Sequence, residues 1–251
     1  LWCIKSFRRM IENKMGMDIY ERDEEGGEEQ DIAAEPVVTA FNTMGVTELC
    51  LDLIADGVDE ELQDECIKLC VGLLFKEGGN RSVQQLMFDY LSRPEAELFF
   101  TQVRAIIKKL VDFHDWNGVV EIEEDDEPDI PTSIMLIRML QLMSEGHFHP
   151  NQEIVREQVN SGASVNLLDD LVAYLKCLSQ IHCRTSTVAA IRVASTILEV
   201  LQGPCKGNQE HLALSTDLLE VLNRVIRATV IRDLVREEVI ELKKIAMDIV
   251  E

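Results

Sequence analysis

Apolar residues recur every three or four positions along almost the whole of this chain. Residues 46–56, for example, place Val46, Leu49, Leu53 and Ile54 on one face, which is the spacing of an amphipathic α-helix. No strand-like alternation persists for more than a few residues. We therefore expect an all-α fold of about ten helices. They are expected at residues 46–56, 62–75, 81–91, 95–113, about 132–146, 151–160, 165–182, 187–201, 209–228 and 230–250.

Consecutive helices with short links can pack in two common ways, and the sequence leaves both open. The chain has 251 residues with only 6 prolines and 13 glycines, too few for an all-β protein with many tight turns. Helices of this length, sparse in aromatic residues, favour an α-solenoid of the armadillo or HEAT type, with helix pairs of about 40 residues. A compact bundle is the alternative, and no exact sequence repeat decides between them.

Negative charge is concentrated in two short segments. The chain has 46 acidic and 24 basic residues, which gives a formal charge of −22. Residues 21–35 hold eight acids and residues 121–129 hold seven; the rest of the chain has 31 acids and 23 bases, or −8. Because like charges repel, we expect both segments to be solvated linkers or disordered loops. The charge also argues against nucleic acid as a partner, since such binding needs clustered lysine and arginine.

These features divide the chain into four segments. Residues 1–38 are expected to form an N-terminal helix and an acidic linker, residues 39–113 a first helical segment, residues 114–131 an acidic loop, and residues 132–251 a second helical segment. No apolar run approaches the length of a membrane span, so we expect no direct membrane insertion of this segment. The chain begins with Leu1 and shows no secretory leader, which indicates a piece of something longer or a processed chain.

The residue types that usually carry catalysis form no recognisable motif. The sequence lacks GxSxG, HExxH and GxxxxGK[ST] patterns. His147 and His149 form an HxH pair after a helix end, but no CxxC or helical histidine pair accompanies them, so we expect turn or cap residues. The seven cysteines are odd in number and irregularly spaced, which is typical of buried thiols in a reducing compartment. We expect no enzymatic activity.

Three stretches of the sequence go beyond generic helix. They are Gly78–Leu91 (GGNRSVQQLMFDYL) followed by Leu98-Phe99-Phe100, Leu140–His147 (LQLMSEGH), and Ile197–Gln209 (ILEVLQGPCKGNQ). Together they resemble the intracellular calcium-release channels, the ryanodine receptors and inositol trisphosphate receptors. The resemblance covers roughly residues 45–228, in the homology-associated stretch of the cytosolic armadillo-like region between the ligand-binding part and the pore.

The resemblance implies a calcium site. In that family two glutamates of this region supply side chains to an activating calcium site, and the matching positions here are Glu145 in LQLMSEGH and Glu199, three residues before the glutamine of QGPC. A backbone carbonyl from a C-terminal domain near the pore completes the site in the family. Gln202 is expected to orient Glu199 from one turn away. The resemblance further implies a homotetramer on the cytosolic face of the endoplasmic or sarcoplasmic reticulum membrane.

The chemistry of the two glutamates supports the same assignment. Glu145 and Glu199 each fall in the last turn of a predicted helix, where the helix dipole disfavours a carboxylate by roughly 0.3–1 kcal/mol unless a cation offsets it. Calcium takes six to eight oxygen ligands. Two carboxylates would leave a weak, incomplete site, suited to sensing. If another domain supplies the remaining ligand, calcium favours the arrangement that brings the domains together.

Two other functions stay open at this stage. The chain could be an adaptor solenoid that binds peptides or partner helices along a concave face, with no channel attached. An unrecognised enzyme would need a reactive side chain, and an unusually acidic thiol at Cys183 or Cys205 would indicate one. The first reading, a regulatory segment of a calcium-release channel, is the one the motifs favour.

Overall fold

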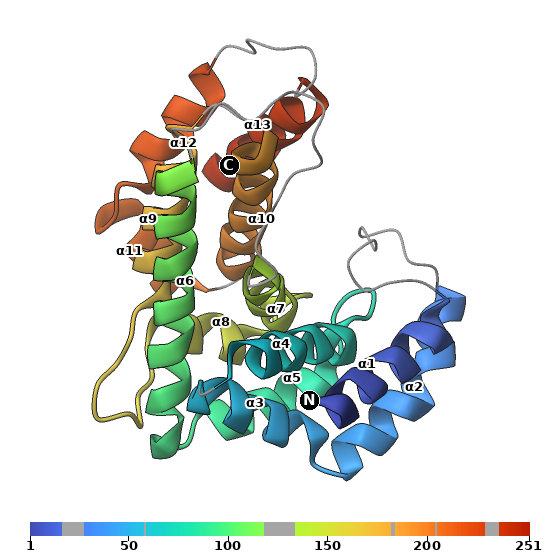
Figure 1. The fold of residues 1–251 in the computed structure, drawn as a ribbon. Helices are drawn as coiled ribbons and strands as arrows, with labels where there is room; N and C mark the ends of the chain where they lie inside the picture. Colours follow the sequence, from blue (N-terminus) through green and yellow to red (C-terminus); the bar gives the residue numbers. More distant parts are fainter. Residues whose placement is uncertain (17–27, 58, 118–133, 182–183, 204, 229–235) are drawn as a thin grey trace.

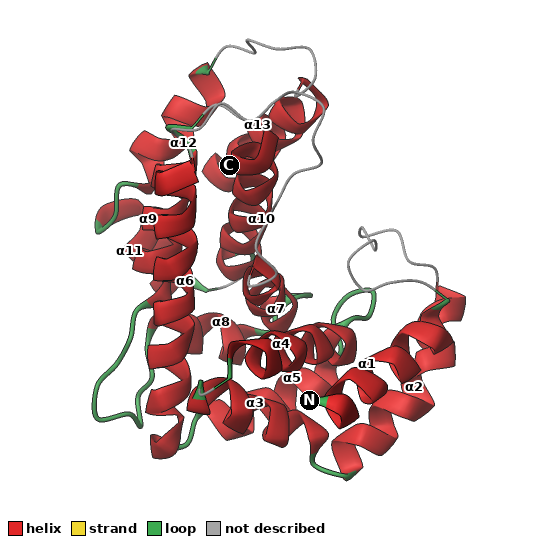
Figure 2. Ribbon diagram, in the orientation of Figure 1, coloured by secondary structure: helices red, strands yellow, loops and turns green. Residues whose placement is uncertain are grey.

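The computed structural model describes residues 1–16, 28–57, 59–117, 134–181, 184–203, 205–228 and 236–251. These residues form thirteen α-helices and one 3₁₀ helix, and none of them lies in a strand (Figure 2). The expected all-α class is therefore confirmed. The helices are α1 (Trp2–Met15), α2 (Glu28–Thr43), α3 (Val46–Asp56), α4 (Glu60–Leu74), α5 (Arg81–Leu91), η1 (Pro94–Ala96), α6 (Glu97–Asn117), α7 (Met135–Ser144), α8 (His149–Arg156), α9 (Leu167–Leu178), α10 (Arg184–Leu201), α11 (Lys206–Leu214), α12 (Leu218–Arg227) and α13 (Arg236–Val250).

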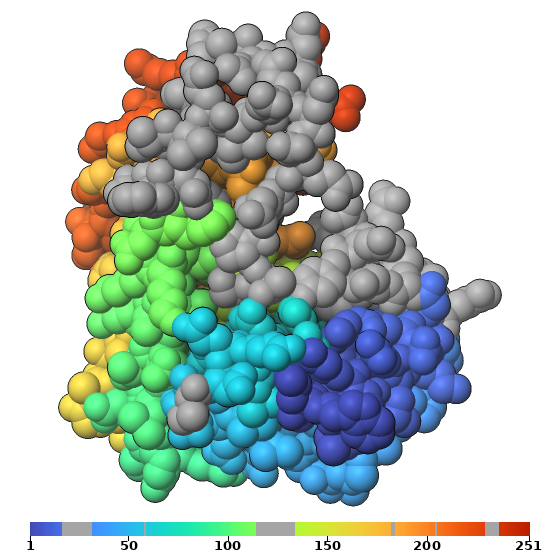
Figure 3. All heavy atoms as spheres, in the orientation of Figure 1, coloured from blue at the N-terminus to red at the C-terminus, as the bar shows by residue number. Residues whose placement is uncertain are grey.

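Most of the helices pack on the helix three positions later, whereas α2 packs on its chain neighbours α1 and α3 (Figure 1). One ladder consists of α1, α4, α7, α10 and α13, a second of α3, α6, α9 and α12, and a third of the short helices α5, α8 and α11. Figure 3 shows α6 in green along one edge of the molecule, beside residues of the later units. The fold is thus solenoid-like, and its unit is three helices, not the pair we expected.

The core lies along the first ladder. α4 packs against α1, α3 and α7, and all ten residues of α7 are buried. A helix with neighbours on several sides needs apolar residues all round, which explains the continuous apolar run from Leu69 to Phe75 at the end of α4. Asp59 caps the start of α4, since its carboxylate accepts a hydrogen bond from the Leu62 amide at 2.8 Å.

The helix expected at residues 209–228 is two helices. α11 ends at Leu214 and α12 begins at Leu218. The hydroxyl of Thr216 accepts a hydrogen bond from the Leu218 amide at 3.2 Å. A threonine side chain that bonds the main chain in this way competes with helix continuation, so the break follows from residues that the apolar periodicity does not register.

The first acidic segment is not a loop throughout. Its second half belongs to α2, and Ala34, Val38 and Phe41 of this helix are buried. The rings of Phe7 and Phe41 lie 4.8 Å apart between centroids, so packing on α1 holds α2 in place despite its acidic start. Residues 21–27 and the second acidic segment, residues 121–129, lie outside the described residues. α6 extends to Asn117, beyond its expected end at residue 113.

Among the described residues no single helix is long and apolar enough to cross a membrane. Residues 32–43 of α2 and the whole of α3 meet at 68°. Taken together, this bent pair has the length and apolar composition of a membrane span.

Candidate functional site

Two of the sequence motifs, distant along the chain, meet at main-chain contact distance. A Cβ atom on Gly146 would come within 2.2 Å of the Gly78 carbonyl oxygen, and one on Gly79 within 2.6 Å of the Glu145 carbonyl oxygen. The turn after α4 is therefore pressed against the turn after α7. Only glycine allows two backbones to approach this closely. This contact explains why the GGN and EGH strings have glycine at Gly79 and Gly146.

The third motif joins from the other side. The His147 amide points at Oε1 of Glu199 at 3.5 Å. A Cβ atom on Gly203 would lie 3.2 Å from the Cβ atom of His147. Because His147 is only two residues beyond Glu145, the structure brings the turn that carries Glu145 against the end of α10 that carries Glu199.

Each glutamate occupies the C-terminal end of its helix. Glu145 is the residue at which α7 ends, with its amide still donating to the Leu142 carbonyl at 3.4 Å. Glu199 lies in the last turn of α10 with 9% of its surface exposed. Both residues are thus held where the carbonyl ends of two helices carry partial negative charge.

Buried amide side chains hold both helix ends. Gln84 donates to the Glu145 carbonyl at 2.9 Å, and Gln152 donates to the Glu199 carbonyl at 2.8 Å. The sequence analysis did not identify either glutamine. Gln202, which was expected to orient Glu199, takes part through its main chain, because its carbonyl accepts from Gln152 at 2.9 Å. Its orienting role remains a prediction.

The positively charged side chain of Arg81 lies at the end of α7. The Arg81 guanidinium donates to the Gly146 carbonyl and stacks over the Phe148 ring, 5.3 Å from its centroid. A positive charge at a helix C-terminus offsets part of the helix dipole. Arg81 therefore lowers the electrostatic cost of the acidic turn at residues 145–147.

The donor chemistry fits calcium only in part. Carboxylate and carbonyl oxygens are the ligands that calcium prefers, and it takes six to eight of them. In the part of the chain that the structure describes, no three His, Cys, Asp or Glu side chains gather as a metal site. A calcium site at these two helix ends would therefore need oxygens beyond those of Glu145 and Glu199.

The histidines and cysteines considered as reactive residues have ordinary structural surroundings where the structure describes them. His147 is exposed, with a left-handed φ of 62°, and His149 at the start of α8 lies 3.7 Å from the Glu153 carboxylate. Burial raises the pKa of the Cys205 thiol, although the Asn208 main chain opposes it, so this thiol is not an activated nucleophile. Cys183 and His182 lie outside the described residues.

The sequence that carries both glutamates matches a known family. Residues 128–226 match the family described as "RyR and IP3R Homology associated". Over these residues the chain is similar to this family, and the expected resemblance to ryanodine and inositol trisphosphate receptors is confirmed. The RyR and IP3R homology associated region, as matched, contains Glu145, Glu199 and Gln202, together with Gln152 of the amide contacts. Gln84 precedes it and reaches its first helix from the preceding unit of the solenoid.

Proposed function

We propose that this chain is a cytosolic regulatory segment of a ligand-gated intracellular calcium-release channel, at the endoplasmic or sarcoplasmic reticulum membrane. The observation that supports the proposal is that the turn carrying Glu145 contacts the helix end carrying Glu199: the His147 amide, two residues beyond Glu145, lies 3.5 Å from the Glu199 carboxylate. The family match includes both residues, and their matching positions in the family supply an activating calcium site.

In this proposal Glu145 and Glu199 provide the two carboxylates of a calcium-sensing site. A bound calcium ion would add positive charge where two helix C-terminal ends carry partial negative charge. The chain's own residues do the rest: the amides of Gln84 and Gln152 fix the two helix ends, and Arg81 carries part of the counter-charge. A C-terminal domain of the same channel would complete the site with further oxygen ligands.

An incomplete site couples binding to movement. If half of the oxygen ligands belong to another domain, calcium binds more tightly when that domain is close, and it shifts the population toward that arrangement. The stacked units of the solenoid would relay the movement to the pore, because α7 and α10 are consecutive members of one ladder. The channel would be a homotetramer, with other domains of the same polypeptide as partners and with no enzymatic activity of its own.

The calcium dependence of opening of the complete channel tests the proposal. We expect Glu145→Gln with Glu199→Gln to raise the calcium concentration for half-maximal opening by about tenfold or more, since each removes one charged ligand. The matched control is Glu210→Gln with Glu241→Gln, two exposed glutamates on α11 and α13, which should leave it unchanged. An unaltered calcium dependence in the first pair would contradict the sensor assignment and favour an adaptor solenoid that binds protein partners.

A further inference from the structure

Gln84 binds the end of a helix in the next unit of the solenoid. This residue of α5 is fully buried. Its side-chain nitrogen donates to the Leu142 carbonyl at 3.0 Å and to the Glu145 carbonyl at 2.9 Å. The last carbonyls of a helix have no partner within the helix, and the two N–H groups of one amide match two of them. Gln84 therefore closes the end of α7 at the residue that bears the first glutamate.

Gln152 repeats this contact one unit later. The residue lies in α8 and is fully buried. Its side-chain nitrogen donates to the Glu199 carbonyl at 2.8 Å and to the Gln202 carbonyl at 2.9 Å. The two carbonyls are again three residues apart at the end of a helix, here α10. Each glutamate of the proposed calcium site thus has its own glutamine, contributed by the preceding unit.

Two asparagines return the contact. Asn151 donates to the main-chain carbonyl of Gln84 at 3.2 Å and to Met143 at 2.9 Å. Asn208 donates to the main-chain carbonyl of Gln152 at 2.7 Å and to Val200 at 3.0 Å. Each asparagine follows the helix that the glutamine holds. Neighbouring units are therefore hydrogen-bonded to each other in both directions.

Within the described residues, two of these four amides, Asn151 and Gln152, form hydrogen bonds only through their donors. In the described part of the chain, Asn151 Oδ1 and Gln152 Oε1 are buried and accept no hydrogen bond. A buried acceptor without a partner costs about 1–3 kcal/mol, so an apolar side chain would serve better if only packing mattered. The N–H groups must then contribute something that an apolar residue cannot, and what they contribute is the position of two helix ends.

We propose that Gln84 and Gln152 are positioning residues for the calcium site: Gln84 sets the place of Glu145, Gln152 sets the place of Glu199, and their reciprocal bonds with Asn151 and Asn208 make the separation of the two carboxylates depend on the alignment of successive units. The proposal rests on the proposed function of the two glutamates. It adds the route by which movement of the solenoid changes the affinity of the site.

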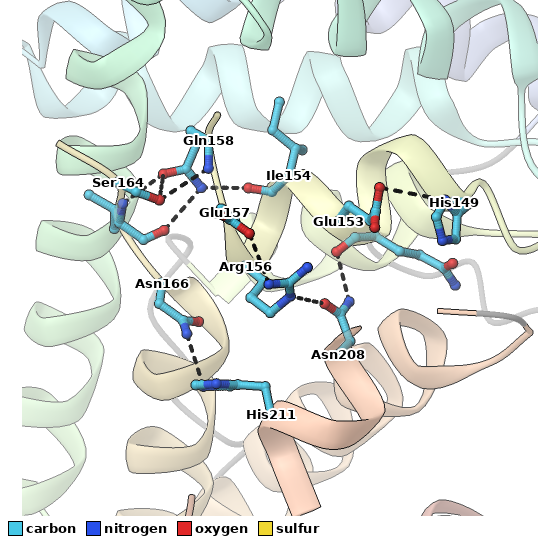
Figure 4. A network of polar contacts seen from close by, with 12 residues as sticks. His149, Glu153, Ile154, Arg156, Glu157, Gln158, Ser164, Asn166, Asn208 and His211 are labelled. Atoms are coloured by element: carbon cyan, nitrogen blue, oxygen red, sulfur yellow. Dashed lines mark hydrogen bonds and ion pairs between the residues drawn. The ribbon is translucent and has the colours of Figure 1, made fainter. Parts of the chain in front are cut away.

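A third buried glutamine provides the control. Gln158 follows α8 and is 4% exposed. Its side-chain nitrogen donates to the carbonyls of Ile154 and Val165, and its oxygen accepts from the Val165 amide at 2.7 Å (Figure 4). Gln158 thus has the same burial and the same kind of contacts as Gln84 and Gln152, but it holds no helix end that bears Glu145 or Glu199.

The experiment replaces each glutamine by methionine, which keeps length and burial but removes the donors. In the complete channel, hydrogen exchange is measured by mass spectrometry over residues 142–149, 197–203 and 157–166, together with the calcium dependence of opening. We expect Gln84→Met to speed exchange in 142–149 and Gln152→Met in 197–203. Each should raise the calcium concentration for half-maximal opening about tenfold, because removing a residue that positions a metal ligand weakens metal binding by about that factor. Gln158→Met should speed exchange only in 157–166 and shift calcium by less than about twofold.

The outcomes separate the two proposals. Equal calcium shifts in all three methionine variants would overturn the positioning role, because a general loss of stability would explain them. So would unchanged calcium dependence at Gln84→Met and Gln152→Met when the glutamate pair variant shifts it. If the glutamate pair has no effect, the proposed function itself fails. Should a methionine variant not assemble, Gln84→Asn and Gln152→Asn keep the amide but shorten its reach, and they should shift exchange and calcium in the same directions by less.

Discussion

Gly146 lies against Gly78 so closely that a Cβ atom on Gly146 would come within 2.2 Å of the Gly78 carbonyl oxygen. Two constraints therefore act on this one position, since Gly146 also has a φ of 66°, where side chains other than glycine are disfavoured. The contact fixes the turn after α7 relative to the turn after α4. It links two motifs that lie more than sixty residues apart in the sequence.

Gly146→Ala separates these two constraints when it is compared with Gly45→Ala. Gly45 also has a positive φ, of 77°, but a Cβ atom there meets nothing within 4 Å. We expect Gly45→Ala to cost roughly 1–2 kcal/mol of unfolding free energy from the backbone alone. Gly146→Ala should cost about 3 kcal/mol or more, because a main-chain clash is added. Denaturant unfolding measures both; equal costs would show that the two turns do not touch.

Asn208 links three segments and should be expensive to remove. Its nitrogen donates to the Gln152 and Val200 carbonyls. Its oxygen accepts from Arg156 Nε at 3.0 Å (Figure 4). Asn208→Ala should lower the free energy of unfolding by about 2–4 kcal/mol, since it leaves buried groups without partners. The neighbouring Gln209 also bonds two carbonyls but is exposed, so Gln209→Ala should cost about 1 kcal/mol or less. A ranking in the opposite order would count against the interlocked units.

Glu65 makes the stability of the chain depend on acidic pH. Burial by itself raises the pKa of this carboxyl group, but hydrogen bonds from Lys68 and Arg8, each at 3.0 Å, outweigh burial and lower it. A lowered pKa in the folded state gives stability that is present above the unfolded value, about 4.3, and is lost as the pH falls through the folded value. Unfolding titrations between pH 7 and pH 3 should show this loss.

Glu65→Gln should flatten that pH dependence and lower the stability at pH 7. Glu61→Gln is the matched control on the same helix, because the Glu61 side chain is 64% exposed and pairs with Lys5 at the surface. If Glu65→Gln kept the full pH dependence of the unmodified chain, the carboxyl of Glu65 would not be its source.

The thiols packed between α3 and α4 should resist alkylation. A hydrogen bond with Cys50 and burial raise the pKa of Cys66. The pKa of Cys50 is also raised, because Cys70 and burial outweigh the opposing hydrogen bond with Cys66. Mass spectrometry after treatment with iodoacetamide at pH 8 should find exposed Cys3 modified first, and Cys50 and Cys66 only as fast as the chain unfolds. Rapid modification of Cys66 in the folded chain would contradict this packing.

The helices of this fold could be predicted from sequence where an apolar stripe ends at a strong break. The expected bounds of the helices at 46–56 and 81–91 agree with α3 and α5. Gly45 and Gly57 flank α3, and Asn80 precedes α5. The prediction failed for 209–228, where Thr216 interrupts the helix through a side-chain bond to the main chain. It also failed for residues 28–35, where burial of α2 against α1 outweighs the local charge.

The residues of the candidate site also fall into those that the sequence identifies and those that it does not. Glu145 and Glu199 could be singled out because they fall in recognisable strings. Gln84 and Gln152 could not, since their partners are main-chain carbonyls, which leave no residue-type signature in the sequence. A weak signal was present: Asn80, Asn151 and Asn208 each donate to a carbonyl seven or eight residues earlier, and each begins a short helix or lies within its first turn.

We propose that Glu145 and Glu199 bind one calcium ion together. The structure of the complete channel, determined once in saturating calcium and once with a chelator, tests this. We expect ion density with calcium only, about 2.3–2.6 Å from a carboxylate oxygen of each glutamate. Density at neither residue in calcium, with each carboxylate paired instead to a basic side chain, would contradict it.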